Sequence, residues 1–450
     1  MFYDFGIGDA WYNCPAGTIE GTISRKRQYK IVNGHMQYMF DTDLKIDDDI
    51  LQEILAKSVD DKMHTIVNSI QREQNQIIRD EQHRVLFVAG PPGSGKTSVA
   101  LHRIAFLLYH DRERINEKNI LILSPNRLFS DYISNVLPEM GEENVLQMTF
   151  QDYNSRSLAR LPVKFEDRAS HLESLLSSTN TGREESSLRA ANISFKSSPG
   201  FDQALRDYLR WLETNLVDNY PSLEFRGQLI FAKEEWKQYY AEHFSAMPAG
   251  VRLKKIRRVI GERMRPLVYA VRAEKETEIV GRAEEVNERV IKARARLAAK
   301  QEFGPLREKI KQLTDLQPLT EYRKLFEDER LVDHSSAKTA FPGQWPSIRQ
   351  QTLGNLKAGI LPYEDIPAFL YFQDSLQGFP VRRDIKHLVV DEAQDYTRLQ
   401  FRILAALFPN ATWTVVGDAA QAIHPFLTPV DFTEVNKIMG RGNSFLFRLT

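Results

Sequence analysis

The feature that most constrains this chain is the octapeptide GPPGSGKT at residues 90–97, which lies between two apolar segments. The run before it, VLFVA at 85–89, is typical of a strand buried on both faces, and SVALHRIAFLL after it has helical spacing. The fixed positions of the phosphate-loop pattern G-x-x-x-x-G-K-[ST] are Gly90, Gly95, Lys96 and Thr97. Strand, glycine loop and helix in this order predict an α/β fold that binds a nucleotide.

The residue types of this loop suit a phosphate. Glycines let the backbone wrap closely around the ligand, so that successive N–H groups point inward. Lys96 is expected to reach the β- and γ-phosphates, and the Thr97 hydroxyl is expected to bind Mg²⁺. ATP and Mg²⁺ are the expected ligands. The residues expected to contact the nucleotide here are Gly90, Pro91, Pro92, Gly93, Ser94, Gly95, Lys96, Thr97 and Ser98.

Further apolar runs predict three more buried strands, at 120–123, 387–390 and 412–417. Each run is followed by a turn signal and a helical pattern, so the four strands predict one doubly wound parallel sheet. More than 250 residues separate the second strand from the third. A βαβ crossover needs only about 30 residues, so we expect a large insertion at this point.

Polar groups follow the last two of these strands. Asp391 is expected to hold Mg²⁺, directly or through a water, and Glu392 is expected to orient and polarise the attacking water. Gln421 is expected beside the γ-phosphate, where one hydrogen bond to its amide distinguishes ATP from ADP. Taken alone, the two acids could equally form only a helix N-cap, and Gln421 could belong to an ordinary turn. Their pairing with the loop favours a nucleotide site.

The other segments give coarser predictions. The first 42 residues indicate β-structure, with a hairpin turn at Asn33-Gly34, and apolar spacing predicts helices around 50–55 and 63–70. Residues 252–313 predict long helices with a thin apolar stripe, typical of a solvent-bridging or coiled-coil-like arm. This stretch holds 18 Lys and Arg against nine Glu and no Asp. It could contact nucleic acid or an acidic protein face, and a solvated helical surface is an equally good interpretation.

Composition excludes several classes of protein. The 60 basic and 60 acidic side chains cancel, so any attraction to nucleic acid must be local. A single cysteine, Cys14, permits no intrachain disulfide and no Cys-rich metal site. No apolar run approaches the ~18 residues of a membrane span, and the first residues lack the pattern of a secretory signal. We therefore expect no membrane association and a reducing, cytoplasmic setting.

Together these motifs resemble the superfamily 1 helicases of the UvrD/Rep type. GPPGSGKT resembles their motif I, DEAQD motif II and GDAAQAI motif III. REQNQII resembles their Q motif and puts Gln74 at the position of the adenine-reading glutamine, and LHRIAFLL is also similar. The resemblance implies a RecA-like P-loop NTPase domain, a parallel sheet with helices on both faces, that binds ATP and Mg²⁺. The segments expected are 1–44, an N-terminal β-hairpin region; 45–150, the first half of motor domain 1A; 151–365, a mostly helical insertion; and 366–450, the second half of that domain.

Longer stretches resemble the HelD proteins of Gram-positive bacteria, among them GTIEGTISRKRQYKIVNGHMQYMFDTD and VVDEAQDYTRLQFRIL. This resemblance implies a protein that binds core RNA polymerase and uses ATP to release it from nucleic acid and recycle it. A 3′–5′ DNA helicase or translocase is the alternative. A third hypothesis is a chain that binds nucleotide and does not hydrolyse it efficiently by itself. The resemblance also implies a second RecA-like domain and an N-terminal coiled-coil arm, and we do not find their sequences here.

The stretch after motif III departs from the UvrD/Rep pattern. It reads IHPFLTP, so Phe426 replaces one aromatic and Leu427 stands where an arginine that grips single-stranded DNA is expected. In motif Ia only Asn126 and Arg127 are similar. Base stacking and phosphate contacts are what hold a single strand. Because fewer residues for these contacts are present here, the sequence favours polymerase remodelling over unwinding.

Overall fold

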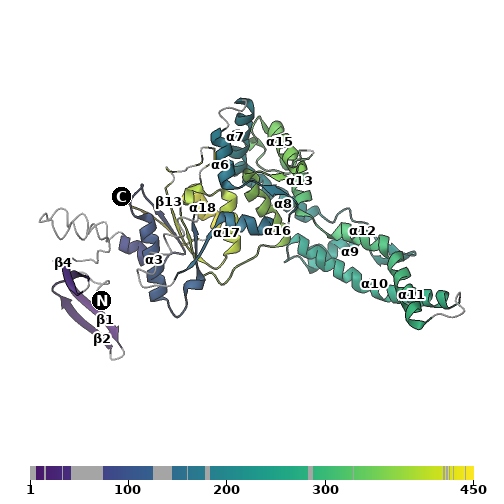
Figure 1. The fold of residues 1–450 in the computed structure, drawn as a ribbon, viewed down its shortest axis with the longest axis horizontal. Coiled ribbons are helices and arrows are strands. Elements are labelled where there is room, and N and C mark those ends of the chain that lie inside the picture. The colour runs from purple at the N-terminus through teal and green to yellow at the C-terminus, as the bar shows by residue number, and fades with distance from the viewer. Residues whose placement is uncertain are drawn as a thin grey trace.

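The computed structural model describes residues 7–14, 17–32, 34–41, 74–124, 144–159, 161–177, 183–281, 287–327, 329–418, 421, 424, 426–428, 430–440 and 442–449. The helices expected around 50–55 and 63–70, together with Asn126 and Arg127, lie outside these residues. Figure 1 shows the sheet and its helices between the N-terminal strands on one side and a body of shorter helices on the other, from which a helical arm extends away. No helix in the described part of the chain is long and apolar enough to cross a membrane.

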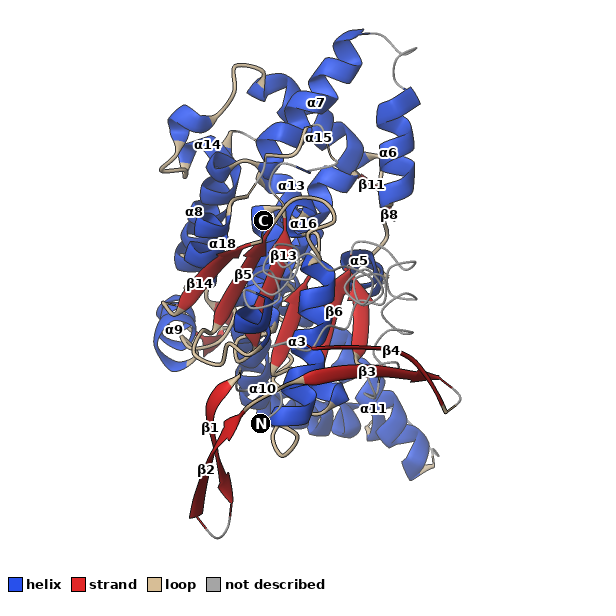
Figure 2. Cartoon of the chain, turned by 90° about the vertical axis from the view of Figure 1, so that its left-hand side faces the viewer, coloured by secondary structure: helices blue, strands red, loops and turns tan. Residues whose placement is uncertain are grey.

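In the described part of the chain the sheet has six strands, and all of its neighbouring pairs are parallel, as expected for an α/β fold (Figure 2). In spatial order the strands are β14 (Ser444–Arg448), β5 (Val85–Ala89), β13 (Thr412–Gly417), β12 (His387–Val390), β6 (Ile120–Ser124) and β7 (Leu146–Thr149). The four predicted strands occupy the centre. The edge strands β7 and β14 were not predicted, because their residues are partly exposed and form no unbroken buried run.

Helices cover both faces of this sheet. Alternate residues of β5 point to opposite faces, so Leu86 and Val88 pack in the core that contains Ile104 of α3 (Lys96–His110). Val85 and Phe87 belong to the larger core on the other face. That core is built with side chains of α5 (Phe150–Leu158), α17 (Arg398–Leu407) and α18 (Phe432–Met439).

The predicted insertion is mostly helical. Its helices include α6 (Arg168–Ser177), α7 (Arg183–Ser197), α8 (Pro199–Asn215), α9 (Lys233–Lys237), the π-helical turn Gln238–His243, α13 (Pro318–Lys324), α14 (Arg330–Asp333) and α15 (Trp345–Lys357), and α16 (Ile366–Gln377) begins directly after the predicted boundary. Its strands are β9 (Leu223–Phe225) and β10 (Gln228–Phe231), which form a hairpin, and β8 (Lys164–Phe165) and β11 (Ile360–Leu361), which pair in parallel. The β8–β11 pair brings the two ends of the insertion together near the boundaries proposed at 151 and 365, which themselves remain predictions.

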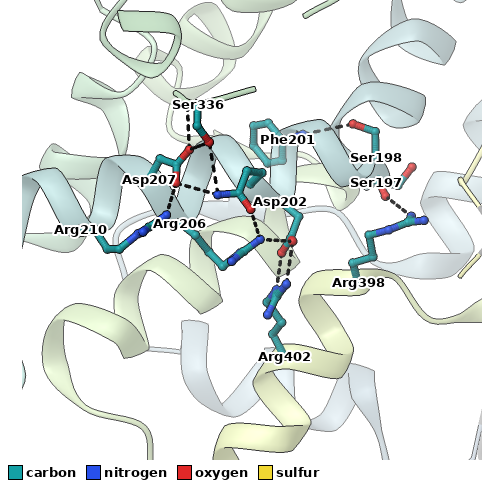
Figure 3. Close-up of polar contacts among 11 residues, drawn as sticks. Ser197, Ser198, Phe201, Asp202, Arg206, Asp207, Arg210, Ser336, Arg398 and Arg402 are labelled. Carbon is teal, nitrogen blue, oxygen red and sulfur yellow. Dashed lines mark hydrogen bonds and ion pairs between the residues drawn. The ribbon is translucent and has the colours of Figure 1, made fainter. Parts of the chain in front are cut away.

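An ion pair and a hydrogen bond attach the insertion to α17, a helix that packs on the sheet. Arg402 of α17 donates from Nη2 to Oδ2 of Asp202 on α8 at 2.9 Å, and Asp202 is only 4% exposed (Figure 3). Arg398, at the first turn of α17, donates to the Ser197 carbonyl at 3.0 Å. The insertion is therefore fixed to the helix that follows the acids of motif II.

The arm consists of α10 (Ala249–Val280), α11 (Glu288–Glu302) and α12 (Gly304–Thr314), which confirms the long helices predicted for 252–313. At the N-terminal end, β1 (Gly8–Cys14) pairs with β2 (Gly17–Ile23), and β3 (Arg27–Val32) pairs with β4 (His35–Asp41). Both pairs are antiparallel, and Val32 lies opposite His35. The hairpin predicted at Asn33-Gly34 is thus confirmed. Among the described residues, four short 3₁₀ segments connect other elements: Glu117–Asn119, Lys338–Ala340, Tyr363–Asp365 and Ala393–Asp395.

Candidate nucleotide site

The loop between β5 and α3 has the backbone of a phosphate cradle. Gly95 caps α3 with a left-handed φ of 78° and offers no side-chain hydrogen bond, so the N–H groups of the first turn are left for a ligand. A Cβ added at Gly90 would lie 2.5 Å from Ser94 Oγ and 3.0 Å from Leu449 Cβ. Only glycine fits this first position of the loop.

Polar groups inside the loop are also suited to an anion. Lys96 Nζ donates to the carbonyls of Gly90 at 2.7 Å and Pro91 at 2.8 Å, so the ammonium lies folded over the loop. The Ser94 hydroxyl is buried and has no hydrogen-bond partner among the described residues. A buried orphan hydroxyl, an ammonium and free N–H groups fit a triphosphate, which accepts hydrogen bonds and carries negative charge.

Asp391 lies beside this loop. It follows β12, which is separated from β5 only by β13, and its Oδ2 accepts a hydrogen bond from the Thr97 hydroxyl at 3.3 Å. Asp391 is 3% exposed, and burial, followed by the charge of Glu392, raises its pKa to about 6. A hydroxyl and a carboxylate are oxygen ligands of the kind that Mg²⁺ prefers. The pair fits the metal position predicted at Thr97 and Asp391.

Glu392 is held in an unusual conformation. Its φ of 47° is left-handed, which is rare for a residue with a side chain and is typical of functional sites. Gln394 donates from Nε2 to Glu392 Oε2 at 2.6 Å, and its Oε1 accepts from the Asp418 N–H at 3.0 Å. Gln394 thus joins the end of β12 to the end of β13. The sequence analysis did not assign it, although an amide two residues after Glu392 was a visible signal.

The two predicted glutamines lie at the same edge of the sheet. Gln74 is in a helical segment, residues 74–78, and its Nε2 lies 3.5 Å from the Cβ position of Gly95. Gln421 donates from Nε2 to Oδ2 of Asp418, which follows β13. Gln74 therefore lies against the phosphate loop, whereas Gln421 is tied to the neighbouring strand. Of the remaining predicted contacts, Pro91, Pro92, Gly93 and Ser98 are exposed.

A buried arginine that the sequence analysis missed holds Gln74's segment in place. Arg103 of α3 is 3% exposed and donates to the carbonyls of Ile77 at 2.7 Å and Asp80 at 2.5 Å. Its Nε donates to Thr414 Oγ1 on β13 at 3.1 Å. Burial lowers the pKa of Arg103 to about 10, so it remains charged at neutral pH. Its only sequence signal was a cation on the apolar face of LHRIAFLL.

The stretch after motif III lies against the insertion. The Thr428 N–H donates to Ser197 Oγ at 2.9 Å, and the Nε2 atoms of His424 and His171 are 2.8 Å apart. Phe426 is 37% exposed and Leu427 is half-buried. The described residues of this stretch, 424 and 426–428, include no Lys or Arg.

Comparison with known proteins identifies a family. The model of the UvrD/REP helicase N-terminal domain matches residues 70–430, which contain the loop, both acids and Gln421. A search among curated proteins found no match.

Proposed function

Because the chain belongs to the UvrD/REP helicase N-terminal domain family, we propose that it binds ATP and Mg²⁺ at the loop of residues 90–97 and hydrolyses the γ-phosphate. The single observation that carries the proposal is the Thr97–Asp391 hydrogen bond, since it joins the loop to the acid strand in one site. At this hydrogen bond, two motifs that are 294 positions apart in the chain bring together a hydroxyl and a carboxylate, which are ligands suited to Mg²⁺.

We assign each residue a role from its surroundings. The N–H groups of the loop and the Lys96 ammonium would bind the phosphates, while Thr97 and Asp391 would hold Mg²⁺. Mg²⁺, when bound, neutralises charge on the phosphate oxygens. Gln74 would read adenine, because an amide both donates and accepts.

Glu392 is the proposed group that orients and polarises the attacking water. Gln394 holds one of its oxygens at 2.6 Å, which leaves the other oxygen as the acceptor for that water. Gln421 is proposed to sense the γ-phosphate. Gln421 donates a hydrogen bond to Asp418, and the Asp418 N–H donates to Gln394, which in turn binds Glu392. Gln421 is thus connected to Glu392 through two residues.

The first test compares two single variants. In Lys96→Ala, loss of a charged hydrogen bond worth about 1.5–3 kcal/mol should weaken ATP binding roughly 10- to 100-fold, measured by calorimetry. In Glu392→Gln, binding should stay near wild type while the hydrolysis rate falls about 10²- to 10⁴-fold. Unchanged affinity in Lys96→Ala would refute the loop assignment, and unchanged turnover in Glu392→Gln would refute the role of that acid.

We further propose that ATP turnover serves to release core RNA polymerase from nucleic acid, as in HelD proteins. Support comes from the resemblance of the N-terminal and motif II stretches and from Leu427, which supplies no charge for a phosphate. The family itself is equally compatible with a 3′–5′ DNA helicase or translocase.

A stalled transcription complex with labelled RNA distinguishes these two activities. Release of the labelled RNA in the presence of ATP, lost in Lys96→Ala, is expected for polymerase recycling. ATP turnover that depends on single-stranded DNA, together with unwinding of a tailed duplex and no release of polymerase, would favour the helicase.

A further inference from the structure

The arm carries an open groove of about 410 Å³ between α10 and α12. Its floor is apolar and consists of Met264 and Val268 from α10 and Ile310 from α12. Met264 and Ile310 are each 5% exposed, so the floor is a packed surface and not a gap in a loosely folded region. The groove is built from the helical arm and includes no residue of the nucleotide site.

Three arginines border this groove: Arg257 and Arg265 on α10, and Arg307 on α12. All three are exposed, and among the described residues none of them makes an ion pair or a hydrogen bond from its side chain. Arg257 and Arg265 lie two helical turns apart on one face of α10. The groove therefore presents three guanidinium groups to any ligand that enters it.

The acids of the arm do not neutralise this charge. Several are engaged elsewhere, such as Glu262 with Arg258 and Glu276 with Arg272, both at 3.2 Å. Glu308 makes no ion pair among the described residues, and it does not line the groove. Farther along, Glu288 pairs with Lys292. Among the described residues, no carboxylate lines the groove. The charge pattern points to an anionic ligand.

Gly261 makes room for that ligand. It lies between Arg257 and Arg265, one turn from each, and nothing in the described structure lies within 4 Å of its Cβ position. Glycine weakens a helix interior relative to alanine, and no close packing in the described structure requires it here. Because Gly261 has no side chain, the groove is open down to the backbone of α10.

An exposed aromatic ring completes the surface. Tyr269, one turn after Arg265, is 67% exposed and has no ring contact among the described residues. A free ring beside guanidinium groups is the combination that single-strand-binding proteins use, since bases stack on the ring and phosphates bind the cations. An acidic peptide would satisfy the arginines and offers no flat partner for Tyr269.

We propose that the groove formed by Arg257, Gly261, Arg265, Tyr269 and Arg307 binds single-stranded nucleic acid. The three guanidinium groups contact phosphates, Tyr269 stacks on a base, and the space above Gly261 admits the strand. The proposal adds a nucleic-acid contact to the proposed function and does not rest on ATP hydrolysis, because the groove and the nucleotide loop share no residue.

The test measures the affinity of the whole chain for a fluorescent 12-nucleotide single strand, as dT and as rU, by anisotropy over a range of salt concentrations. In the triple variant Arg257→Ala, Arg265→Ala, Arg307→Ala, affinity should fall at least tenfold. The slope of log affinity against log salt concentration should fall by about 2, since each phosphate contact on a single strand contributes about 0.7.

The matched control is Lys254→Ala, Arg294→Ala, Arg296→Ala, which removes three exposed cations of the same arm outside the groove. Its affinity should change less than threefold.

Two single variants separate stacking and shape from charge. Tyr269→Ala should weaken binding about tenfold at an unchanged salt slope, because it removes a ring and no charge. Gly261→Leu should also weaken binding while the helical circular dichroism is retained or increased.

Three results would overturn the proposal. They are an equal loss in the control triple, full affinity in both single variants, or a 12-residue glutamate peptide that competes as well as the oligonucleotide. Lys96→Ala should bind the oligonucleotide like wild type, so failure at the groove and failure at the ATP site are distinguishable.

Discussion

At the scale of single residues, Gln394 is the side chain that connects the chemistry of the site to its neighbouring strand. Its Nε2 binds the Glu392 carboxylate and its Oε1 binds the Asp418 N–H. The loop and the two acids could be predicted from sequence because each directly follows its own buried strand, β5 for the loop and β12 for Asp391 and Glu392. The role of Gln394 could not, since it depends on β12 and β13 lying side by side.

Gln394→Leu should therefore lower kcat for ATP hydrolysis about 10- to 100-fold, because a hydrogen bond to a charged group is lost and Glu392 is left free to rotate. The affinity for ATP should change less than threefold. Steady-state kinetics with a separate binding measurement checks both. A rise in KM with kcat unchanged would show that Gln394 acts in binding, against our assignment.

At the scale of elements, β12 is attached to β13 by a buried histidine as well as by the strand ladder. Arg103 Nε donates to Thr414 Oγ1, whose hydroxyl donates in turn to His387 Nε2 at 3.2 Å. His387 Nδ1 then donates to Thr412 Oγ1 at 2.7 Å. These directions are those of a neutral His387 ring that is protonated at Nδ1. Burial, followed by the charge of Arg103, lowers its pKa to about 3.

We predict a pH-dependent weakening of the fold from His387. Its folded pKa is about 3 against 6.5 in the unfolded chain, so protons bind the unfolded state preferentially. The contribution of neutral His387 to the free energy of unfolding is complete above pH 6.5 and is lost as the pH falls from 6.5 toward 3. Between pH 7 and pH 5 it should decrease by about 2 kcal/mol. His387→Gln keeps a polar group without the titration, so its urea-derived free energy of unfolding should fall by that much less over the same interval. Equal falls in both proteins would contradict the prediction.

The central strands of the sheet were predictable and its edges were not. β5, β6, β12 and β13 are continuous apolar runs because helices cover them on both faces. β14 has two half-buried and three exposed residues, and only one of the four residues of β7 is buried. A strand at an edge needs fewer apolar residues, so its pattern carries less information.

At the scale of the whole molecule, the insertion is joined to the sheet by charges that sequence reasoning could not pair. The length of the gap between two strands predicted an insertion. Nothing local indicates that Asp202 meets Arg402, 200 positions away. Asp202 also has Arg206 at 3.3 Å, so two cations share one buried carboxylate.

Removing one partner of this buried pair should be costly. Arg402→Met leaves Asp202 with a single cation, and we expect a loss of about 3 kcal/mol in the free energy of unfolding. Asp202→Asn in the same background should recover part of that loss, since no uncompensated charge then remains. A denaturant-based double-mutant cycle measures the coupling. Strictly additive losses would show that the two side chains do not act as a pair.

The pairing of β8 with β11 has a consequence for how the insertion is connected to the rest of the protein. Lys164 and Ile360 are opposite one another in this two-stranded ladder, and neighbouring strands lie only about 4.8 Å apart. Everything from α6 to α15 leaves the motor and returns to it at a single point. The length of chain between β8 and β11 can therefore change without altering the positions of Thr97 and Asp391, provided that the contacts of Asp202 and Ser197 with α17 are kept.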